Sequence, residues 1–271
     1  MPRLARLFVY PIKSCGGIEV DRALLTPRGL AGDRRYMLID ARGRFLTQRR
    51  HPGMALIETA FVDDGSFEVR APGQEPLRLP AGFEGPGFAT CEVRIWSDTV
   101  EATLADAETN LWFSAAMGFA CGLVYQAEHQ HRPVPNEAAG FEDEVGFADG
   151  APVLLISQAS LDELNGRLER PVGIERFRPN LVVTADAAHA EDGWRSIAIG
   201  TARLDVAWPC SRCVLPTVDP STGEPDPDGE PLRTLQRYRR RERSVHFGQN
   251  LIPRAGGRLD VGAECVIEER P

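Results

Sequence analysis

The chain has 271 residues, of which 42% are hydrophobic and 26% are charged, and its net charge is −8 at pH 7. This composition is ordinary for a globular protein with a sizeable core. It contains no apolar run of the roughly 18 residues that a membrane helix needs, so we expect no membrane partner. The first residues read as a strand and not as a secretion signal, which predicts a cytoplasmic location and six reduced cysteines.

The charge is unevenly distributed along the chain. Residues 1–50 carry eleven basic and four acidic side chains, so this region has a net charge of +7 and the remainder has −15. A basic region on an acidic protein favours a local anion site over a nucleic-acid surface, and no nucleic-acid partner is expected. Of 31 basic residues only Lys13 is a lysine, which is consistent either with a site for a compact charge or with compositional accident.

The first third of the chain reads as short strands joined by turns. Alternation of apolar residues predicts strands over residues 4–12, 18–25, 35–40, 55–62, 67–70 and 91–96. Asp63, Asp64 and Gly65 form a hairpin signal between two of these strands. The Pro- and Gly-rich residues 71–87 are expected to form a loop.

Helices are few in the predicted pattern. Capping residues and apolar spacing predict helices over residues 106–117, 157–168 and 231–241. Further strands are predicted over residues 153–156, 181–185, 202–208, 249–253 and 264–268. Many short strands with few helices predict an α+β, mainly β protein with two β-barrel-like halves. The polar residues 136–150 suggest the boundary, which divides the chain into residues 1–135 and 136–271.

The segment 209–224, PCSRCVLPTVDPSTGE, is the strongest candidate for chemistry. Cys210 and Cys213 stand three residues apart, and the guanidinium of Arg212 would stabilise a thiolate beside it. A thioredoxin-type pair is disfavoured because two prolines follow and a helix is unlikely to start here. A structural zinc site is disfavoured because there is no second cysteine pair. One of the two thiols is still open to being a buried, inert cysteine.

Three other segments suit an anionic ligand. They are Lys13–Ser14 at a strand end, the turn Gly32–Arg35, and Phe177–Asn180. Arginine forks bind phosphate, and an asparagine amide can pair with the edge of a heterocycle. Each segment taken alone is better explained as a surface ion pair or a turn cap, and it is their combination with the cysteine segment that favours a site. Lys13 is also open to a Schiff-base role with pyridoxal phosphate, although the thiol loop would then have no function.

Four motifs in series carry a resemblance to a known family. YPIKSC, GDRRY, FRPN and CSRCxxxTVDPxTG occur in that order over residues 10–223. In this the chain resembles the MOSC family, named for the C-terminal domain of molybdenum-cofactor sulfurases. It is similar in particular to members related to the mitochondrial amidoxime-reducing component. The likeness runs from about residue 4 to residue 267.

The resemblance implies a molybdenum cofactor of the molybdopterin type, bound in a cleft between the two halves. It implies that Cys213 is the molybdenum ligand, and that Lys13, Ser14 and Arg34 hold the phosphate end or the pterin. The remaining cofactor-binding residues that it implies are Ser157, Arg178, Asn180, Ser211 and Arg212. Soft thiolates suit a heavy metal and a helix start at Ser157 would suit an anion, so the residue types agree.

Asp219 is a candidate proton relay in the same loop. A carboxylate six residues after the metal ligand could face the same cavity. An Asx-type turn cap before Pro220 is an equally good interpretation of this residue.

The activity implied by the resemblance is two-electron reduction of small N-hydroxylated compounds such as amidoximes and hydroxylamines. The cysteines lack the C-x₄-C-x₂-C spacing of a plant-type iron–sulfur cluster, so we expect a separate electron donor resembling ferredoxin, flavodoxin or cytochrome b5. The arginine-rich run 237–243 is either its docking patch or a solvated helix face. A cofactor-binding or sulfur-carrier module without reductase activity is the alternative function.

Overall fold

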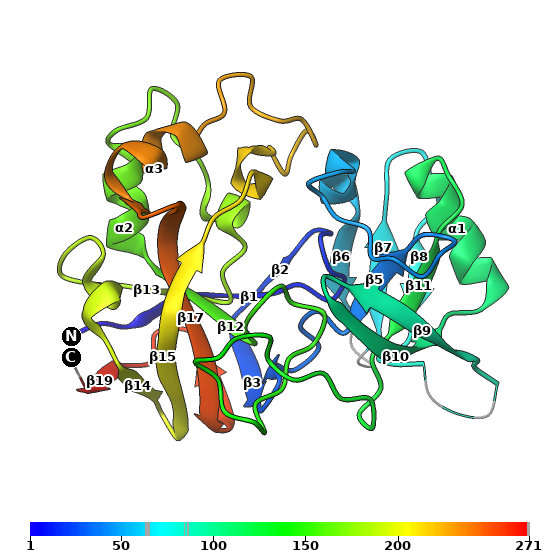
Figure 1. The fold of residues 1–271 in the computed structure, drawn as a ribbon, viewed down its shortest axis with the longest axis horizontal. Helices are drawn as coiled ribbons and strands as arrows, with labels where there is room; N and C mark the ends of the chain where they lie inside the picture. Colours follow the sequence, from blue (N-terminus) through cyan, green and yellow to red (C-terminus); the bar gives the residue numbers. More distant parts are fainter. Residues whose placement is uncertain (63–65, 84, 86, 270–271) are drawn as a thin grey trace.

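The computed structural model describes residues 1–62, 66–83, 85 and 87–269. Its strands lie in two lobes, shown side by side in Figure 1. The first lobe is built on a large sheet whose strands come mainly from the C-terminal half of the chain. The second lobe holds the smaller sheets of residues 36–125. The prediction of a mainly β protein with few helices is confirmed.

The large sheet combines both ends of the chain. In spatial order its strands are β19 (Cys265–Glu269), β14 (Ser196–Ile199), β15 (Ala202–Ser211), β17 (Ser244–Ala255), β12 (Val153–Ser157), β13 (Leu181–Val183), β1 (Leu4–Val9) and β2 (Ile18–Val20), and β16 (Arg240–Arg241) pairs with β17. Leu7 pairs with Leu181, and Leu155 pairs with Leu181 from the other side, so three strands meet in one buried apolar row. The first strand of the sequence therefore belongs to the lobe of the last.

Three smaller sheets complete the described fold. Their strands are β5 (Tyr36–Ile39), β11 (Gly122–Tyr125), β10 (Asp98–Leu104) and β9 (Thr90–Ile95) in one, β18 (Gly257–Asp260), β3 (Arg22–Thr26) and β4 (Gly29–Leu30) in the next, and β6 (Glu58–Phe61), β7 (Phe67–Arg70) and β8 (Leu77–Leu79) in the third. The predicted hairpin between β6 and β7 is confirmed by their antiparallel pairing, while its turn residues 63–65 lie outside the described residues. The loop predicted over residues 71–87 is wrong at β8, which pairs with β7.

Each helix begins or ends at a residue that explains it. The helices are α1 (Ala107–Met117), α2 (Gln158–Asn165) and α3 (Leu232–Tyr238), with 3₁₀ turns at Pro52–Leu56, Ile174–Phe177, Ala190–Gly193 and Leu215–Thr217. The carboxylate of Asp106 accepts the amide hydrogen of Thr109, which caps α1. In the described part of the chain, none of the helices has both the length and the apolar character required to cross a bilayer.

Two predicted helices are shorter than expected. The helix predicted over 157–168 ends at Asn165, whose side chain bonds both backbone groups of Val172 and so turns the chain. The helix predicted over 231–241 ends at Tyr238, because Arg240 and Arg241 pair with Val245 and Ser244 as a β-hairpin.

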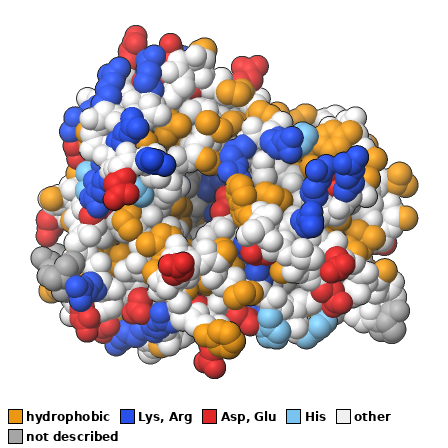
Figure 2. All heavy atoms as spheres, viewed as in Figure 1, with side chains coloured by type: hydrophobic (Ala, Val, Ile, Leu, Met, Phe, Trp, Pro, Cys, Tyr) orange, Lys and Arg blue, Asp and Glu red, His pale blue; other side chains and the backbone are white. Residues whose placement is uncertain are grey.

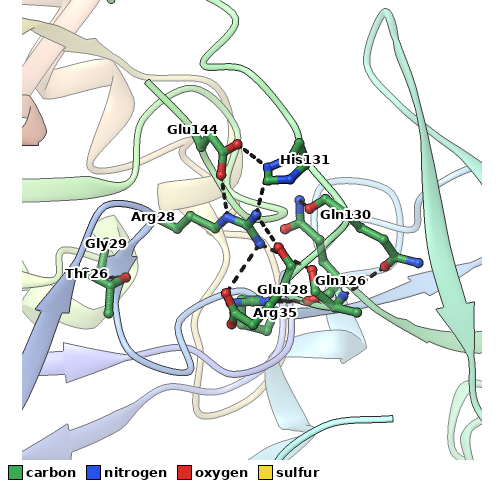
Figure 3. Close-up of polar contacts among 10 residues, drawn as sticks. Thr26, Arg28, Gly29, Arg35, Gln126, Glu128, Gln130, His131 and Glu144 are labelled. Atoms are coloured by element: carbon green, nitrogen blue, oxygen red, sulfur yellow. Dashed lines mark hydrogen bonds and ion pairs between the residues drawn. The ribbon is translucent and has the colours of Figure 1, made fainter. Parts of the chain in front are cut away.

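A buried arginine fastens the segment that joins the two lobes. Arg28, between β3 and β4, donates to a Glu144 carboxylate oxygen at 2.7 Å and to the Glu128 carbonyl oxygen at 2.8 Å (Figure 3). His131 contacts both Arg28 and the other oxygen of Glu144. Arg35 reaches Glu128 from the second lobe at 2.7 Å. Residues 126–144 are thus held against the first lobe before the chain enters β12.

Candidate functional site

A pocket of about 740 Å³ is lined by residues of both lobes, and Figure 2 shows the surface hollowed between them. This volume is within the usual range for a cofactor or substrate site. Eight of the ten residues that the sequence predicted for the site line this one pocket: Lys13, Ser14, Arg34, Arg178, Asn180, Ser211, Arg212 and Cys213. Segments up to 200 residues apart in the sequence therefore meet here.

Three neighbouring strands form one wall of the pocket. Leu154 on β12 and Trp208 on β15 both pair with Asn250 on β17, so the three side chains are neighbours across the sheet. Val153 and Leu155 pack in the apolar core. Because successive strand residues point to opposite faces, Leu154 points away from that core.

Four lining residues adopt left-handed backbone conformations. The φ angles are 66° at Ser14, 47° at Arg34, 56° at Trp96 and 55° at Arg178. Such residues cost about 1–3 kcal/mol each when they are not glycine, and they persist where the surroundings hold them. Backbone hydrogen bonds do so here: the Arg34 amide donates to the Tyr10 carbonyl oxygen at 2.7 Å, and the Arg178 amide donates to the Glu175 carbonyl oxygen at 3.2 Å. The strained backbone therefore lowers the stability of the fold and sets the direction of these pocket-lining side chains.

Asn180 ties the pocket together from a fully buried position. Its amide nitrogen donates to the carbonyl oxygen of Phe8 at 3.2 Å and to Asp33 at 3.0 Å. Its amide oxygen accepts from Arg34 and from the Leu154 backbone amide, each at 3.1 Å. With these four bonds the side chain joins β1, β12 and the turn that holds Asp33 and Arg34, and it has little capacity left for a ligand.

The single lysine of the chain is buried in the pocket wall. Lys13 is 4% exposed, donates to the carbonyl oxygen of Phe147 at 2.7 Å and forms an ion pair with Asp149. Burial, together with the charges of Arg132 and Arg34, lowers the pKa of Lys13 to about 8, although Asp149 opposes the shift. Burial opposes the ionisation of Asp149 as well, but Lys13 more than offsets this and lowers the pKa of Asp149 to about 2. The carboxylate is charged at neutral pH, whereas the ammonium is close to losing its proton.

The lowered pKa of Lys13 predicts that anion binding depends on pH. As pH rises through about 8, Lys13 loses its charge, so the affinity of cofactor-free protein for sulfate should fall by up to about tenfold per pH unit between pH 8 and 9.5. Over the same range the unfolded chain binds more protons than the folded one at this site, so the contribution of Lys13 to the unfolding free energy should rise. Calorimetric titration with sulfate, whose charge is constant, measures the first effect. In Lys13→Arg, which keeps its charge, the fall should disappear; a wild-type affinity that is constant with pH contradicts the prediction.

Two guanidiniums lie against the ring of Tyr10. The central carbons of Arg34 and Arg178 are 4.5 and 4.2 Å from the ring centroid. Arg34 has a carboxylate partner, Asp33, at 2.6 Å. Burial alone would lower the pKa of Arg34, but the charge and hydrogen bond of Asp33 outweigh it and leave that pKa raised.

Arg178 forms no ion pair with a carboxylate among the described residues, and the charge of Asp33 compensates it only in part. One of its terminal nitrogens donates to the Cys15 carbonyl oxygen at 2.6 Å, while the other, Nη2, is buried without a hydrogen-bond partner among the described residues. Burial and the neighbouring charge of Arg34 lower the pKa of Arg178 to about 10. A half-buried cation with a buried, unused donor is a site that an anion would stabilise.

The cysteine loop leaves the sheet at the end of β15. Cys213 is exposed, and its sulfur is 3.5 Å from the amide nitrogen of Leu215. Cys210 is half-buried, and burial raises the pKa of its thiol, with Arg212 opposing. The guanidinium of Arg212 donates to the carbonyl oxygens of Phe247 and Phe177, so it fixes the loop to its neighbours. The two thiols therefore differ in environment, and Cys213 is the accessible one.

The structure does not bring two of the predicted residues to this pocket. Ser157 is fully buried and caps α2, and the carboxylate of Glu191 already accepts from its amide and from Ser160. The anion seat expected at this helix start is thus occupied by the protein itself. Asp219 lies in a separate groove, where it pairs with Arg176 at 2.8 Å and accepts from Ser221, as the turn-cap interpretation expected.

Several lining residues were not found by sequence reasoning. They include Asp149, which partners Lys13, and Trp96, whose indole donates to Asp149 at 3.2 Å. Asp149 stands in the polar stretch that was interpreted only as a boundary. A carboxylate two to four residues before a strand is a common pattern, so the sequence alone does not identify Asp149 as a site residue.

Comparison with known families agrees with the motifs. Residues 1–119 match the MOSC N-terminal beta barrel domain, and residues 142–266 match the MOSC domain. The boundary predicted after residue 135 falls between these ranges, although β1 and β2 join the sheet of the second range.

Individual relatives cover most of the chain. Mitochondrial amidoxime reducing component 2 of Bos taurus is 35% identical over 244 residues, which are 87% of this chain and 72% of that protein. Mitochondrial amidoxime-reducing component 1 of Mus musculus is 35% identical, with coverage of 87% and 71%. Molybdenum cofactor sulfurase of Solanum lycopersicum is 34% identical over 264 residues, which are 90% of this chain but 32% of that protein. On these matches, the chain belongs to the MOSC family.

Proposed function

We propose that this protein is a molybdenum-cofactor-dependent reductase of small N-hydroxylated compounds, such as amidoximes and hydroxylamines. One observation carries the proposal: the same pocket holds an accessible thiol, Cys213, and a half-buried guanidinium, Arg178, that has no carboxylate partner among the described residues. A soft metal ligand and an anion site in one cavity match the two chemical ends of a molybdopterin cofactor. The amidoxime-reducing relatives agree with this choice.

The residues present fit such a cofactor. The unpartnered Nη2 of Arg178 needs an acceptor, and a phosphate oxygen or a pterin carbonyl oxygen would supply one. Lys13, Ser14 and Arg34 would bind the phosphate end together with Arg178, and Ser211 would line the path to Cys213. Asn180 and Arg212 would act indirectly, because their hydrogen bonds hold Arg34 and the cysteine loop in place.

The chemistry of the bound group would be removal of oxygen from an N–O bond with two electrons. The chain itself would supply the thiolate of Cys213 and an enclosed site. Trp96, Trp208 and Pro216 offer apolar walls against which a small organic substrate could pack. We further propose a separate redox protein as the electron source, because the cysteines lack the spacing of a plant-type cluster.

A second candidate function is a cofactor or sulfur carrier without reductase activity. The similarity to a molybdenum cofactor sulfurase favours it, since that match spans 90% of this chain. In this case the pocket would hold the same group, but no substrate would turn over. The two candidates differ only in what the loaded protein does.

Elemental analysis and one assay test the proposal. Protein from a cofactor-competent host should contain molybdenum and cofactor phosphorus near one per chain, and it should reduce benzamidoxime with reduced methyl viologen as the donor. Stoichiometric molybdenum without benzamidoxime turnover supports the carrier instead. Absence of molybdenum from protein made in such a host rejects both.

A further inference from the structure

Building on the proposed function, we propose that the arginine hairpin is the docking surface for an acidic electron-carrier protein. The arginine hairpin is defined here as residues 237–245, which comprise the end of α3, strand β16 and the start of β17. A reductase needs such a surface close to its metal site. The charge, the position and the rigidity of the hairpin each support this role.

The hairpin is cationic on an acidic protein. Arg237, Arg240 and Arg243 are exposed, and none forms an ion pair with a carboxylate in the described residues. Arg239 and Arg241 share the single carboxylate of Asp192, at 2.7 and 2.8 Å. Figure 2 shows basic side chains gathered on the upper left of the hollow, over the region where Figure 1 places α2 and α3. Since the whole chain carries −8, this local excess would steer an acidic partner to one face.

The hairpin stands beside the cysteine loop. Arg240 pairs with Val245, and the carbonyl oxygen of Val245 accepts the amide hydrogen of Arg212 at 2.8 Å. Two strand spacings, about 10 Å, therefore separate the backbone of Arg240 from the residue that precedes Cys213. Electron transfer weakens steeply with distance, so a carrier seated here would have a short path to a metal on that thiolate.

Hydrogen bonds to Asp192 and His246 hold the backbone that carries these arginines. Asp192 accepts from Gln249 of β17 at 2.6 Å as well as from the two arginines. Arg239 is buried and also donates to the backbone carbonyl oxygen of His246, a residue that lines the pocket. Exposed guanidiniums on a fixed backbone suit a brief, salt-sensitive encounter, which is typical of redox partners.

The electron balance defines the partner. Reduction of an N-hydroxy group breaks the N–O bond, consumes two electrons and two protons, and releases water and the N–H compound. A carrier that gives one electron must therefore dock twice per turnover and leave between visits. A weak electrostatic contact allows this exchange, whereas a large apolar interface would hinder it.

Steady-state reduction of benzamidoxime with two electron donors tests the proposal. With reduced [2Fe–2S] ferredoxin as the probe, Arg240→Glu/Arg243→Glu should lower kcat/KM for ferredoxin at least about tenfold at low ionic strength. The matched control is Arg22→Glu/Arg258→Glu, which makes the same charge change on the paired strands β3 and β18; Figure 1 shows β3 near the bottom of the view and α3 near the top. The control should retain the wild-type value, and salt should slow the wild type but not the hairpin variant.

Small-molecule reduction separates this inference from the proposed function. Reduced methyl viologen needs no docking surface, so its turnover should be equal in the wild type and both variants. Three results would overturn the docking surface. They are an equal loss of kcat/KM for ferredoxin in the hairpin and control variants, a wild-type kcat/KM that does not depend on salt, and a wild-type protein that ferredoxin does not reduce. If the wild-type protein contains the molybdenum cofactor but does not reduce benzamidoxime with methyl viologen either, the proposed reductase function is wrong.

Discussion

Cys213→Ala protein should lose benzamidoxime turnover by more than about 100-fold, because even residues that only support a metal ligand cost about 10–100-fold when they are changed. The thiol of Cys213 is exposed at the pocket, and in the proposed function it is the protein's bond to molybdenum. Alanine removes the sulfur and leaves the backbone of the loop unchanged. The measurement is molybdenum content per chain together with turnover driven by reduced methyl viologen.

Cys210→Ala is the matched control for this experiment. Cys210 lies three residues away at the end of β15 and lines the same pocket, but burial raises the pKa of its thiol and disfavours the thiolate. This variant should keep its molybdenum and most of its activity. If Cys210→Ala loses molybdenum and turnover while Cys213→Ala keeps both, the metal ligand has been assigned to the wrong sulfur. If both retain full turnover, no thiolate of this loop serves the reaction.

Arg178→Met should nearly abolish binding of the cofactor while affecting the fold little. An anion bound to a buried guanidinium loses about 2–5 kcal/mol when that partner is removed, which corresponds to roughly 30-fold or more in Kd. Among the described residues, the cofactor-free protein loses one side-chain hydrogen bond, to the Cys15 carbonyl oxygen, at a cost of about 1–3 kcal/mol, and the cation–π contact with Tyr10, at a cost of about 0.5–2 kcal/mol. Removal of a half-buried charge that has no carboxylate partner in the described part of the chain offsets part of this cost.

Urea denaturation of the cofactor-free protein and phosphorus content after expression in a cofactor-competent host measure the two effects. Arg176→Met provides the control, because Arg176 precedes Arg178 by two residues but pairs with Asp219 outside the pocket. It should retain the cofactor. Loss of cofactor in both variants, or a collapse of stability in Arg178→Met alone, would show that Arg178 supports the fold and does not bind an anion.

The local signals of the sequence were sufficient for many elements. Apolar alternation located β1, β7, β9 and β12 within a few residues, and Asp106 marked the start of α1. Strands β10 and β14 were not predicted, because what makes them strands is their pairing with β9 and β15. The end of α2 depends on the hydrogen bonds of Asn165 to Val172, and the end of α3 depends on hairpin pairing, and neither contact is marked by a capping residue.

Residue types and motif order alone indicated the family and the chemical groups of the site: one lysine, a pair of cysteines, two arginine turns and an asparagine, in the order of the MOSC motifs. Which of these residues share a pocket followed from the folded chain. The pocket includes Asp149 and Trp96, and Ser157 and Asp219 lie outside it. The physical reason is that motif spacing records residue type and local turns, whereas burial, ion-pair partners and the unused donor of Arg178 depend on chain segments brought together by strand pairing.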